Sequence, residues 1–241
     1  MRAIHQRSEA GGAPAPQSIA VVAPSGHAPL PNAIEFDARW KDTNVARNRY
    51  KRAFDLLFAT FMLLFLSPLL LLIAAVIYGE SGGPVLFKQE RTGYRGRVFT
   101  ILKFRTMTVT EAGAEALQAT RDDARITKIG VVLRKLSLDE LPQLFNVARG
   151  DMSLIGPRPH AVGHDAQFAQ FVPGYAERFL AKPGLTGLAQ VNGRRGEIRS
   201  PDCIRNRVAD DCAYVRQWSL WLDLQILART VPLLFGDANA Y

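Results

Sequence analysis

An uncharged, largely apolar run covers residues 56–78 and carries basic residues on both sides. Its 23 residues would let a straight helix cross a hydrocarbon core of roughly 30 Å. Pro68 lies at its centre, where a proline removes a backbone donor and its ring clashes with the carbonyl of Leu64. We therefore expect the helix to break at Ser67 and Pro68, with the Ser67 hydroxyl bonding a backbone group that the break frees.

The charges beside the run bear on whether it crosses the membrane. Five Lys or Arg residues lie between positions 41 and 52, and six lie between positions 88 and 105. A spanning helix is expected to carry its excess of Lys and Arg on the cytoplasmic side only. The balance favours a re-entrant hairpin, helix–break–helix, that enters and leaves from the cytoplasmic face. A proline-kinked spanning helix remains the alternative.

Composition divides the chain into three parts. Residues 1–45 are rich in Ala, Pro, Gly and Ser and are predicted to be a disordered tail without the apolar core of a signal peptide. Residues 46–80 form the predicted membrane hairpin. Residues 81–241 are predicted to be a cytoplasmic domain around one core. Its two cysteines, Cys203 and Cys212, fit neither a disulfide framework nor a metal motif.

Hydrophobic periodicity predicts an α/β fold that is mostly helical. Strands are expected at 85–89 and 98–104, and helices at 110–120, 122–136, 138–149, 168–179 (apart from Pro173 and Gly174) and 207–235. The last of these holds Trp218 and Trp221 beside several arginines. It is predicted either to lie in the membrane interface as an amphipathic helix or to pack its tryptophans into the core.

Two adjacent carboxylates, Asp139 and Glu140, stand near a predicted helix start. Ser137 and Glu140 have capping-box spacing, but Asp139 is itself a good N-cap and places Pro142 where its missing N–H costs little. We expect Asp139 at the cap or in the first turn, a position that also attracts phosphate. An Asp there can act as a nucleophile toward phosphorus. The alternative is a capped helix without chemistry.

Cations near this pair in the sequence would offset its repulsion of a phosphate. Arg binds phosphate through two nitrogens, and a divalent metal held by a carboxylate would bridge the charges in the same way. Arg158 lies between Pro157 and Pro159, whose fixed φ angles aim its guanidinium at low entropic cost. A stiff turn with an exposed Arg is the alternative. The glycine-rich stretch 182–194 and the basic strand 103–107 are weak signals alone.

The formal net charge is +8 at pH 7. Such an excess in a membrane protein points to anionic lipid head groups, phosphorylated substrates or both. Charge alone also permits nucleic-acid binding, but the sequence has no helix-turn-helix, zinc or stacking-sheet signature. We therefore expect no nucleic-acid partner.

Taken together, these segments resemble the bacterial sugar transferases, a family of monotopic phosphoglycosyl transferases. The resemblance covers about residues 50–235. It is carried by the motifs Lys51-Arg-Ala-Phe-Asp55, Ser67-Pro68, Lys103-Phe-Arg-Thr-Met107, Leu133-Arg-Lys-Leu-Ser-Leu-Asp-Glu-Leu-Pro-Gln143, Gly150-Asp-Met-Ser153, Gly156-Pro-Arg-Pro159 and Lys182-Pro-Gly-Leu-Thr-Gly187, and near the C-terminus by Asp211, Tyr214, Trp218-Ser219 and Asp223.

The resemblance implies an enzyme of the bacterial inner membrane whose catalytic domain faces the cytoplasm. It would transfer a sugar-1-phosphate from a UDP-sugar to undecaprenyl phosphate and release UMP. The family's nucleophile falls on Asp139, which would form a covalent phospho-sugar intermediate, and its partner carboxylate falls on Glu140. Both are expected Mg²⁺ ligands. The remaining substrate and phosphate site is predicted from the matched motifs: Arg134, Arg158, Lys103, Arg105, Pro157, Pro159, Lys182 and Thr186.

The sequence is most similar to minimal family members that start exopolysaccharide repeat units with glucose or galactose, and an N-acetylated or diamino sugar is the alternative. Residues 195–201 match no motif and leave the sugar open. Expected partners are the UDP-sugar, undecaprenyl phosphate and membrane lipids, while downstream glycosyltransferases and a homodimer stay open. A rival hypothesis is a non-catalytic membrane-anchored module that binds phosphorylated lipids or recruits glycosyltransferases. Such a module would not need Asp139.

Overall fold

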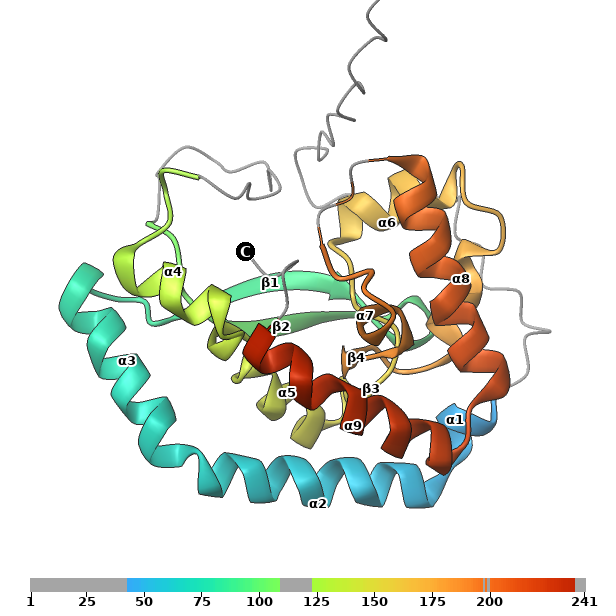
Figure 1. Cartoon of the computed structure of the whole chain (residues 1–241), viewed down its shortest axis with the longest axis horizontal. Helices are drawn as coiled ribbons and strands as arrows, with labels where there is room; N and C mark the ends of the chain where they lie inside the picture. The colour runs from blue at the N-terminus through green and yellow to red at the C-terminus, as the bar shows by residue number, and fades with distance from the viewer. Residues whose placement is uncertain (1–42, 109–122, 197, 199, 237–241) are drawn as a thin grey trace, which may run out of the picture.

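The computed structural model describes residues 43–108, 123–196, 198 and 200–236 (Figure 1). The predicted tail up to residue 42 and the predicted helix at 110–120 lie outside the described residues. Across the described residues the fold is mostly helical and has two small sheets, which agrees with the predicted α/β class.

The apolar run forms two helices, α2 (Arg49–Phe65) and α3 (Ser67–Ser81), after the short helix α1 (Asn44–Arg47). Within the described ranges, no single helix is long and apolar enough to cross a membrane, whereas α2 and α3 together are, with a bend of 61° between them. The Ser67 hydroxyl donates to the Leu64 carbonyl at 2.8 Å. That carbonyl is the one that Pro68, lacking an N–H, leaves without its helical donor. The predicted break is therefore confirmed.

Both arms of the bent pair pack on the domain that follows. Helix α2 lies against α5 (Gln143–Arg149), and α3 lies against α4 (Lys128–Lys135) (Figure 1). Arg52 donates to the carbonyls of Val147 and Ala148 at 2.7 and 2.8 Å, at the C-terminal end of α5. Ile73 and Ile77 of α3 are buried beside Leu133 of α4. Both arms of the bent pair thus contact the same domain.

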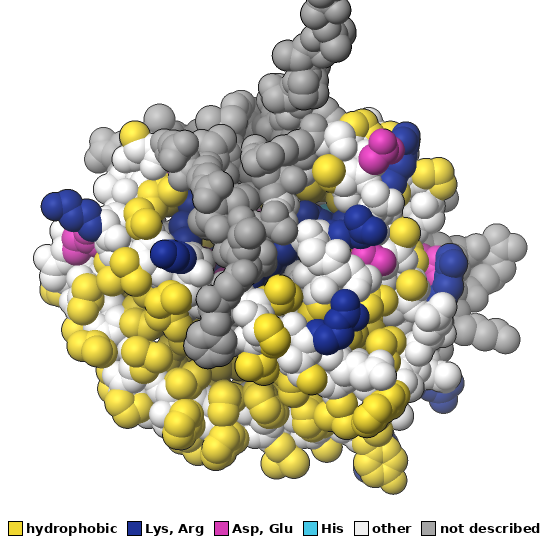
Figure 2. Space-filling model, viewed as in Figure 1, with side chains coloured by type: hydrophobic (Ala, Val, Ile, Leu, Met, Phe, Trp, Pro, Cys, Tyr) yellow, Lys and Arg dark blue, Asp and Glu magenta, His cyan; other side chains and the backbone are white. Residues whose placement is uncertain are grey.

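The outer side of the pair is apolar. Leu57, Leu64 and Phe65 of α2 and Leu71 and Leu72 of α3 are exposed. Figure 2 shows hydrophobic side chains gathered over the edge of the molecule that α2, α3 and α9 (Leu220–Gly236) form. A continuous exposed apolar surface of this kind is typical of a membrane-contacting face.

Strand β1 (Leu86–Thr92) pairs antiparallel with β2 (Val98–Phe104), and the 3₁₀ turn η1 (Tyr94–Gly96) joins them. Both strands were expected, and β1 runs three residues beyond the predicted end. A second sheet joins β3 (Ser153–Ile155) and β4 (Gly184–Thr186) in parallel. Neither β3 nor β4 is among the strands expected from the sequence, because three-residue strands are too short to show alternation.

The helices around the carboxylates differ from the expectation. Helix α4 begins at Lys128 instead of 122, because Thr127 caps it by accepting from the Gly130 N–H at 3.0 Å. The helix expected at 138–149 divides into a 3₁₀ turn, η2 (Leu138–Glu140), and α5, which begins at Gln143. Ser137, with φ 57°, adopts the left-handed conformation between α4 and η2.

The C-terminal half contains α6 (Val162–Ala169), the 3₁₀ helix η3 (Tyr175–Leu180), α7 (Leu188–Val191), α8 (Pro201–Gln217) and α9. Gly174, with φ 72°, separates α6 from η3. The stretch 207–235 is helical as expected, apart from a break at Trp218 and Ser219. Trp218 has non-helical backbone angles there, and α9 starts at Leu220.

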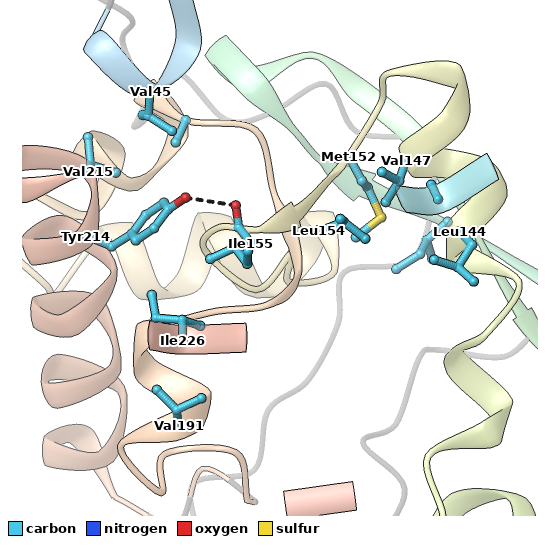
Figure 3. Close-up of a cluster of buried hydrophobic side chains, with 13 residues drawn as sticks. Val45, Leu144, Val147, Met152, Leu154, Ile155, Val191, Tyr214, Val215 and Ile226 are labelled. Carbon is cyan, nitrogen blue, oxygen red and sulfur yellow. Dashed lines mark hydrogen bonds between the residues drawn. The ribbon is translucent and has the colours of Figure 1, made fainter. Parts of the chain in front are cut away.

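The main core joins α2, α5, β3, α8 and α9 (Figure 3). Tyr214 of α8 points to β3 and donates to the Ile155 carbonyl at 2.9 Å. The expectation that the tryptophans pack into the core is confirmed for one of them and wrong for the other, whereas the position of α9 in the membrane interface stays a prediction. Trp218 packs against this core, whereas Trp221 is 68% exposed on the apolar face. Helix α9 is therefore amphipathic, with one side in the core and one on the surface.

Candidate active site

The two carboxylates lie in the 3₁₀ turn η2, which is held between β2 and α4. Asp139 is half-buried and Glu140 is buried. The expectation that Asp139 caps the helix or lies in its first turn is wrong, because neither the Ser137 cap bond nor an Asp139 cap forms and both carboxylates lie in a separate 3₁₀ turn. The Ser137 hydroxyl accepts from Arg195 Nη2 at 2.6 Å instead. Because α5 begins three residues after Glu140, the carboxylates precede that helix and do not cap it.

Glu140 is clamped by two cations from different elements. Arg158, in the loop after β3, donates Nη1 to Oε2 at 3.1 Å and Nη2 to Oε1 at 2.5 Å. Lys103, on β2, donates Nζ to Oε1 at 2.8 Å. A bidentate pair of this kind fixes the orientation of both side chains. The structure thereby brings together three residues that are 37 and 18 positions apart in the chain.

The loop that carries Arg158 is tied to the second sheet. The Gly156 N–H donates to the Thr186 carbonyl, and the Gly184 N–H donates to the Pro157 carbonyl, both at 2.9 Å. A Cβ on Gly184 would lie 2.1 Å from the Gly156 nitrogen, so the two backbones approach each other more closely than any side chain allows. Gly156 and Gly184 therefore allow the close approach of the Arg158 loop to β4.

The neighbouring carboxylates differ in their electrostatics. Burial raises the pKa of Asp139, with opposition from Lys103 and a smaller upward contribution from Glu140. Burial would also raise the pKa of Glu140, but Arg158 and Lys103 outweigh it and hold that pKa well below the ordinary value. Glu140 is therefore the stable anion of the pair. Asp139 is the one whose negative charge is poorly stabilised in the resting protein, which is the condition for a reactive oxygen.

Arg134 lies near the same pair. It stands in the last turn of α4, one of its nitrogens is 4.0 Å from Met107 Sδ, and its charge acts to lower the pKa of Asp139. Lys103, Arg134 and Arg158 thus surround the two carboxylates from three elements. Pro157 and Pro159 flank Arg158 as the sequence requires.

Three other residues of the predicted site are engaged away from the carboxylates. Arg105 is buried and donates to the Ser81 hydroxyl at 2.6 Å and to the Gly83 carbonyl at 3.0 Å, so it fastens the end of the hairpin. Lys182 lies beside Gly150, where burial and then Arg52 lower its pKa. Thr186 is buried, and its hydroxyl lies 2.8 Å from that of Thr230 on α9. In the structure, Arg105, Lys182 and Thr186 therefore contact neighbouring elements and not the two carboxylates.

Sequence reasoning missed Arg195 and Arg178. Arg195 touches Ser137, two residues before Asp139, from the loop after α7. Its only sequence signal is the pair of arginines after the Asn192-Gly193 turn. Arg178 is buried behind the Arg158 loop. In the sequence it is a lone arginine in a predicted helix, and no motif indicates that it is buried.

The described ranges contain no group of three or more His, Cys, Asp or Glu residues arranged to hold a metal ion. Asp139 and Glu140 form a pair of oxygen donors only. A pair is nevertheless what Mg²⁺ uses in many phosphate-handling sites, where substrate phosphates and water complete the coordination.

Known proteins supply the last observation. The family model described as bacterial sugar transferase matches residues 46–237 of this chain. The chain belongs to the bacterial sugar transferase family. The family resemblance read from the motifs is therefore confirmed, and the match includes α2, α3 and the carboxylate pair.

Several curated relatives share this part of the chain. The UDP-glucose:undecaprenyl-phosphate glucose-1-phosphate transferase of Caulobacter vibrioides is 51% identical over 197 residues, which cover 82% of this chain and 74% of that protein. The Escherichia coli protein of the same name is 47% identical over 191 residues, but this chain covers 41% of its length. The exopolysaccharide production protein ExoY of Rhizobium meliloti is 42% identical over 208 residues, covering 79% of this chain and 88% of that protein.

Proposed function

We propose that this protein transfers glucose-1-phosphate from UDP-glucose to undecaprenyl phosphate, releases UMP and thereby starts exopolysaccharide assembly. The observation that carries the proposal is the unequal carboxylate pair: Asp139 with a raised pKa beside Glu140, which Arg158 and Lys103 hold as an anion. The names of the relatives support glucose over galactose. A 43% identical relative from Aeromonas hydrophila is named for N-acetylgalactosamine, so that sugar is the first alternative donor to test.

In the first step, a carboxylate oxygen of Asp139 attacks the phosphorus that bears the glucose. The bond from that phosphorus to the oxygen bridging the two phosphates breaks, and UMP leaves with the electron pair on this oxygen. The product on the enzyme is an acyl phosphate that joins Asp139 to glucose-1-phosphate. Because negative charge builds on the phosphoryl oxygens and on UMP, the cations Lys103, Arg134 and Arg158 are suited to stabilise the transition state.

In the second step, a phosphate oxygen of undecaprenyl phosphate attacks the same phosphorus. The bond between phosphorus and Asp139 breaks and regenerates the carboxylate, and undecaprenyl-diphosphate glucose is released. The same Asp139 oxygen attacks in the first step and leaves in the second. Lys103, whose charge acts to lower the pKa of Asp139, is suited to stabilise the carboxylate that leaves.

The donor set fits a magnesium ion held by Asp139 and Glu140 together with the substrate phosphates. Such an ion would neutralise charge on the phosphoryl oxygens. Glu140 already accepts from Arg158 and Lys103, so its preset orientation would lower the cost of ordering a metal ligand.

We infer that α2 and α3 enter the membrane as a re-entrant hairpin on the cytoplasmic side of the inner membrane. The supporting observation is that both arms contact one domain: Arg52 of α2 bonds the end of α5, and Ile77 of α3 packs near Leu133. A spanning helix would carry its two ends to opposite faces. The apolar side of α9 would then rest in the interface and hold the carboxylates near the lipid phosphate.

Topology is tested with single cysteines at two exposed positions, Tyr50→Cys before the hairpin and Lys88→Cys after it, in a background without Cys203 and Cys212. In intact spheroplasts, a membrane-impermeant thiol reagent should label neither position, and lysis should expose both. Labelling of one position in intact spheroplasts would show that the pair spans the membrane.

The reaction is tested by following UMP release from UDP-glucose, UDP-galactose and UDP-N-acetylgalactosamine with Mg²⁺ and undecaprenyl phosphate. The proposal expects sustained release that requires the lipid, favours UDP-glucose and disappears in Asp139→Ala. Arg205→Ala, on the exposed face of α8, is the matched control and should keep wild-type rates. Lipid binding without UMP release from any nucleotide sugar would favour the non-catalytic module.

A further inference from the structure

Arg178, in η3, is buried with 2% of its surface exposed, and it lies behind the Arg158 loop. A buried guanidinium is costly unless its charge and its donors find partners. Asp211 on α8 supplies the charge: its Oδ2 accepts from Nε at 3.2 Å and from Nη2 at 2.8 Å. Asp165 on α6 adds a second carboxylate 3.5 Å from Nη1.

The remaining donors of Arg178 point to three other groups. Nη1 lies 2.8 Å from His160 Nδ1 and 2.9 Å from the Tyr175 hydroxyl. Nη2 donates to the backbone carbonyl of Arg158 at 2.5 Å. An arginine has five N–H donors, so each one has an acceptor here. Because arginine cannot accept, His160 Nδ1 must do so, which fits a neutral imidazole whose pKa burial and Arg178 hold well below the ordinary value.

The contact with Arg158 completes a series along the loop. The Gly156 N–H and the Pro157 carbonyl bond the backbone of Thr186 and Gly184, both within β4, and the Pro159 carbonyl accepts from Arg91 at 3.3 Å. Arg158 is held by Arg178, a charged side chain that is itself fixed to α8. Every residue from 156 to 159 thus has a backbone hydrogen bond to another element. Rotation of the peptide after Arg158 would break the bond to Arg178.

We propose that Arg178, anchored by Asp211, is a positioning residue that sets the direction of the Arg158 guanidinium toward Glu140 and the substrate phosphates. The proposal rests on the function proposed above. The same nitrogen, Nη2, contacts both Asp211 and the Arg158 carbonyl, so the geometry of α8 is transmitted to the loop through one rigid group. A lysine has no planar pair of nitrogens and cannot make the same set of contacts.

The test is a double-mutant cycle with Arg178→Lys and Arg158→Lys, read as kcat and KM for UDP-glucose in the UMP-release assay. A shift of about 1 Å at a reacting group costs up to about 100-fold, so Arg178→Lys should lower kcat/KM by about 10- to 100-fold alone. In the Arg158→Lys background, it should lower kcat/KM by less than about 3-fold, because the group that it positions is already absent. The loss should fall mainly on kcat.

Two variants keep the test decisive if Arg178→Lys folds poorly. Asp211→Asn keeps an oxygen acceptor but removes the charge, and it should show the same dependence on Arg158 with a smaller loss. Val208→Ala opens the buried apolar cluster in which Val208 of α8 packs with Tyr175 and Phe179 of η3, and it does not touch the loop. At an equal fall in Tm it should leave kcat/KM within about 3-fold of wild type.

Three results would count against the account in different ways. The positioning role would be overturned if Arg178→Lys lowered kcat/KM by the same factor in the wild-type and Arg158→Lys backgrounds, or if Asp211→Asn did so. Equal activity losses from Val208→Ala and Arg178→Lys would do the same. A wild-type protein that releases no UMP from any donor would refute the proposed function, and the positioning role would fall with it.

Discussion

Arg158 donates through two nitrogens to both carboxylate oxygens of Glu140, at 3.1 and 2.5 Å. This pair joins the loop after β3 to the 3₁₀ turn that carries Asp139. It also makes two adjacent carboxylates unequal, because Glu140 has its charge balanced by Arg158 and Lys103 while burial works against the charge on Asp139. The division of roles between a charged partner and a nucleophile follows from that asymmetry.

Replacing Asp139 with Asn should abolish turnover without weakening the fold. Loss of a covalent nucleophile typically costs about 10⁴-fold or more in kcat. Burial raises the pKa of Asp139, so the folded state binds this proton more tightly than the unfolded chain and the ionised group opposes folding at neutral pH. The neutral Asn removes that opposition. Thermal unfolding at pH 7 should therefore give a Tm equal to or above that of wild type, and a clear fall in Tm or retained turnover would contradict the assignment.

The pH dependence of kcat/KM should report Asp139. The nucleophile must be ionised, and its raised pKa places the acid limb above the ordinary Asp value of 3.8. Activity should rise with pH through this limb. The measurement is the initial rate of UMP release at saturating lipid across the acid range in which the protein stays folded. A rate that stays constant down to the ordinary Asp pKa would show that Asp139 does not titrate in this way.

Glu140→Gln should move that acid limb to lower pH. The substitution removes a neighbouring negative charge that raises the pKa of Asp139, and it also frees Lys103 and Arg158 to stabilise an Asp139 anion. Both effects have the same sign. We also expect a rate about 10- to 100-fold lower and a higher Mg²⁺ concentration for half-maximal activity, as for other altered metal-site groups. An unchanged limb together with an unchanged Mg²⁺ titration would remove both assigned roles.

Pro68→Ala should partly straighten the hairpin. Alanine restores the N–H that can donate to the Leu64 carbonyl, which Ser67 now satisfies from its side chain. Because Arg52 and Ile77 bind opposite arms to one domain, a straighter pair would strain those contacts. Activity in membranes should fall. Labelling of Lys88→Cys in intact spheroplasts, which is absent when the hairpin is bent, would report the altered topology. The control is Ser67→Ala, which leaves the proline in place and should have the smaller effect.

Gly184→Ala should disable the Arg158 loop. The new Cβ would meet the Gly156 nitrogen at 2.1 Å and the Thr186 carbonyl oxygen at 2.4 Å, so β3 and β4 would have to separate. Overpacking of this kind costs about 1–3 kcal/mol or more. The matched control is Gly79→Ala on α3, where a Cβ meets nothing within 4 Å. Equal Tm and activity for the two variants would show that the close approach of the strands is not required.

Sequence reasoning predicted the break at Ser67 and Pro68, the first sheet and the carboxylate pair, because each has a local cause: a missing donor, an alternating pattern or a short motif. It placed helix starts wrongly around Asp139. The left-handed Ser137 and the 3₁₀ turn after it depend on contacts with β2 and with Arg195, which are distant in the chain. No periodicity records such contacts.

The candidate site was predictable as a set of residue types and only partly as a set of contacts. The motifs correctly bring Lys103, Glu140 and Arg158 together. They do not reveal that Arg105 fastens the hairpin end or that Thr186 faces α9. The role of Arg178 depends on four hydrogen-bond acceptor groups and the carboxylate of Asp165, and only the folded chain shows that they converge.

The central claim is that Asp139 becomes covalently bonded to the sugar phosphate. It is tested most directly by mixing the purified protein with UDP-glucose and Mg²⁺ in the absence of undecaprenyl phosphate, quenching rapidly, and measuring the intact mass and the modified peptide. The account predicts a mass increase of one hexose phosphate on the peptide that contains Asp139, matched by one UMP per enzyme and absent in Asp139→Asn. Sustained turnover in the presence of lipid, with no adduct in its absence and wild-type rates in Asp139→Asn, would contradict it.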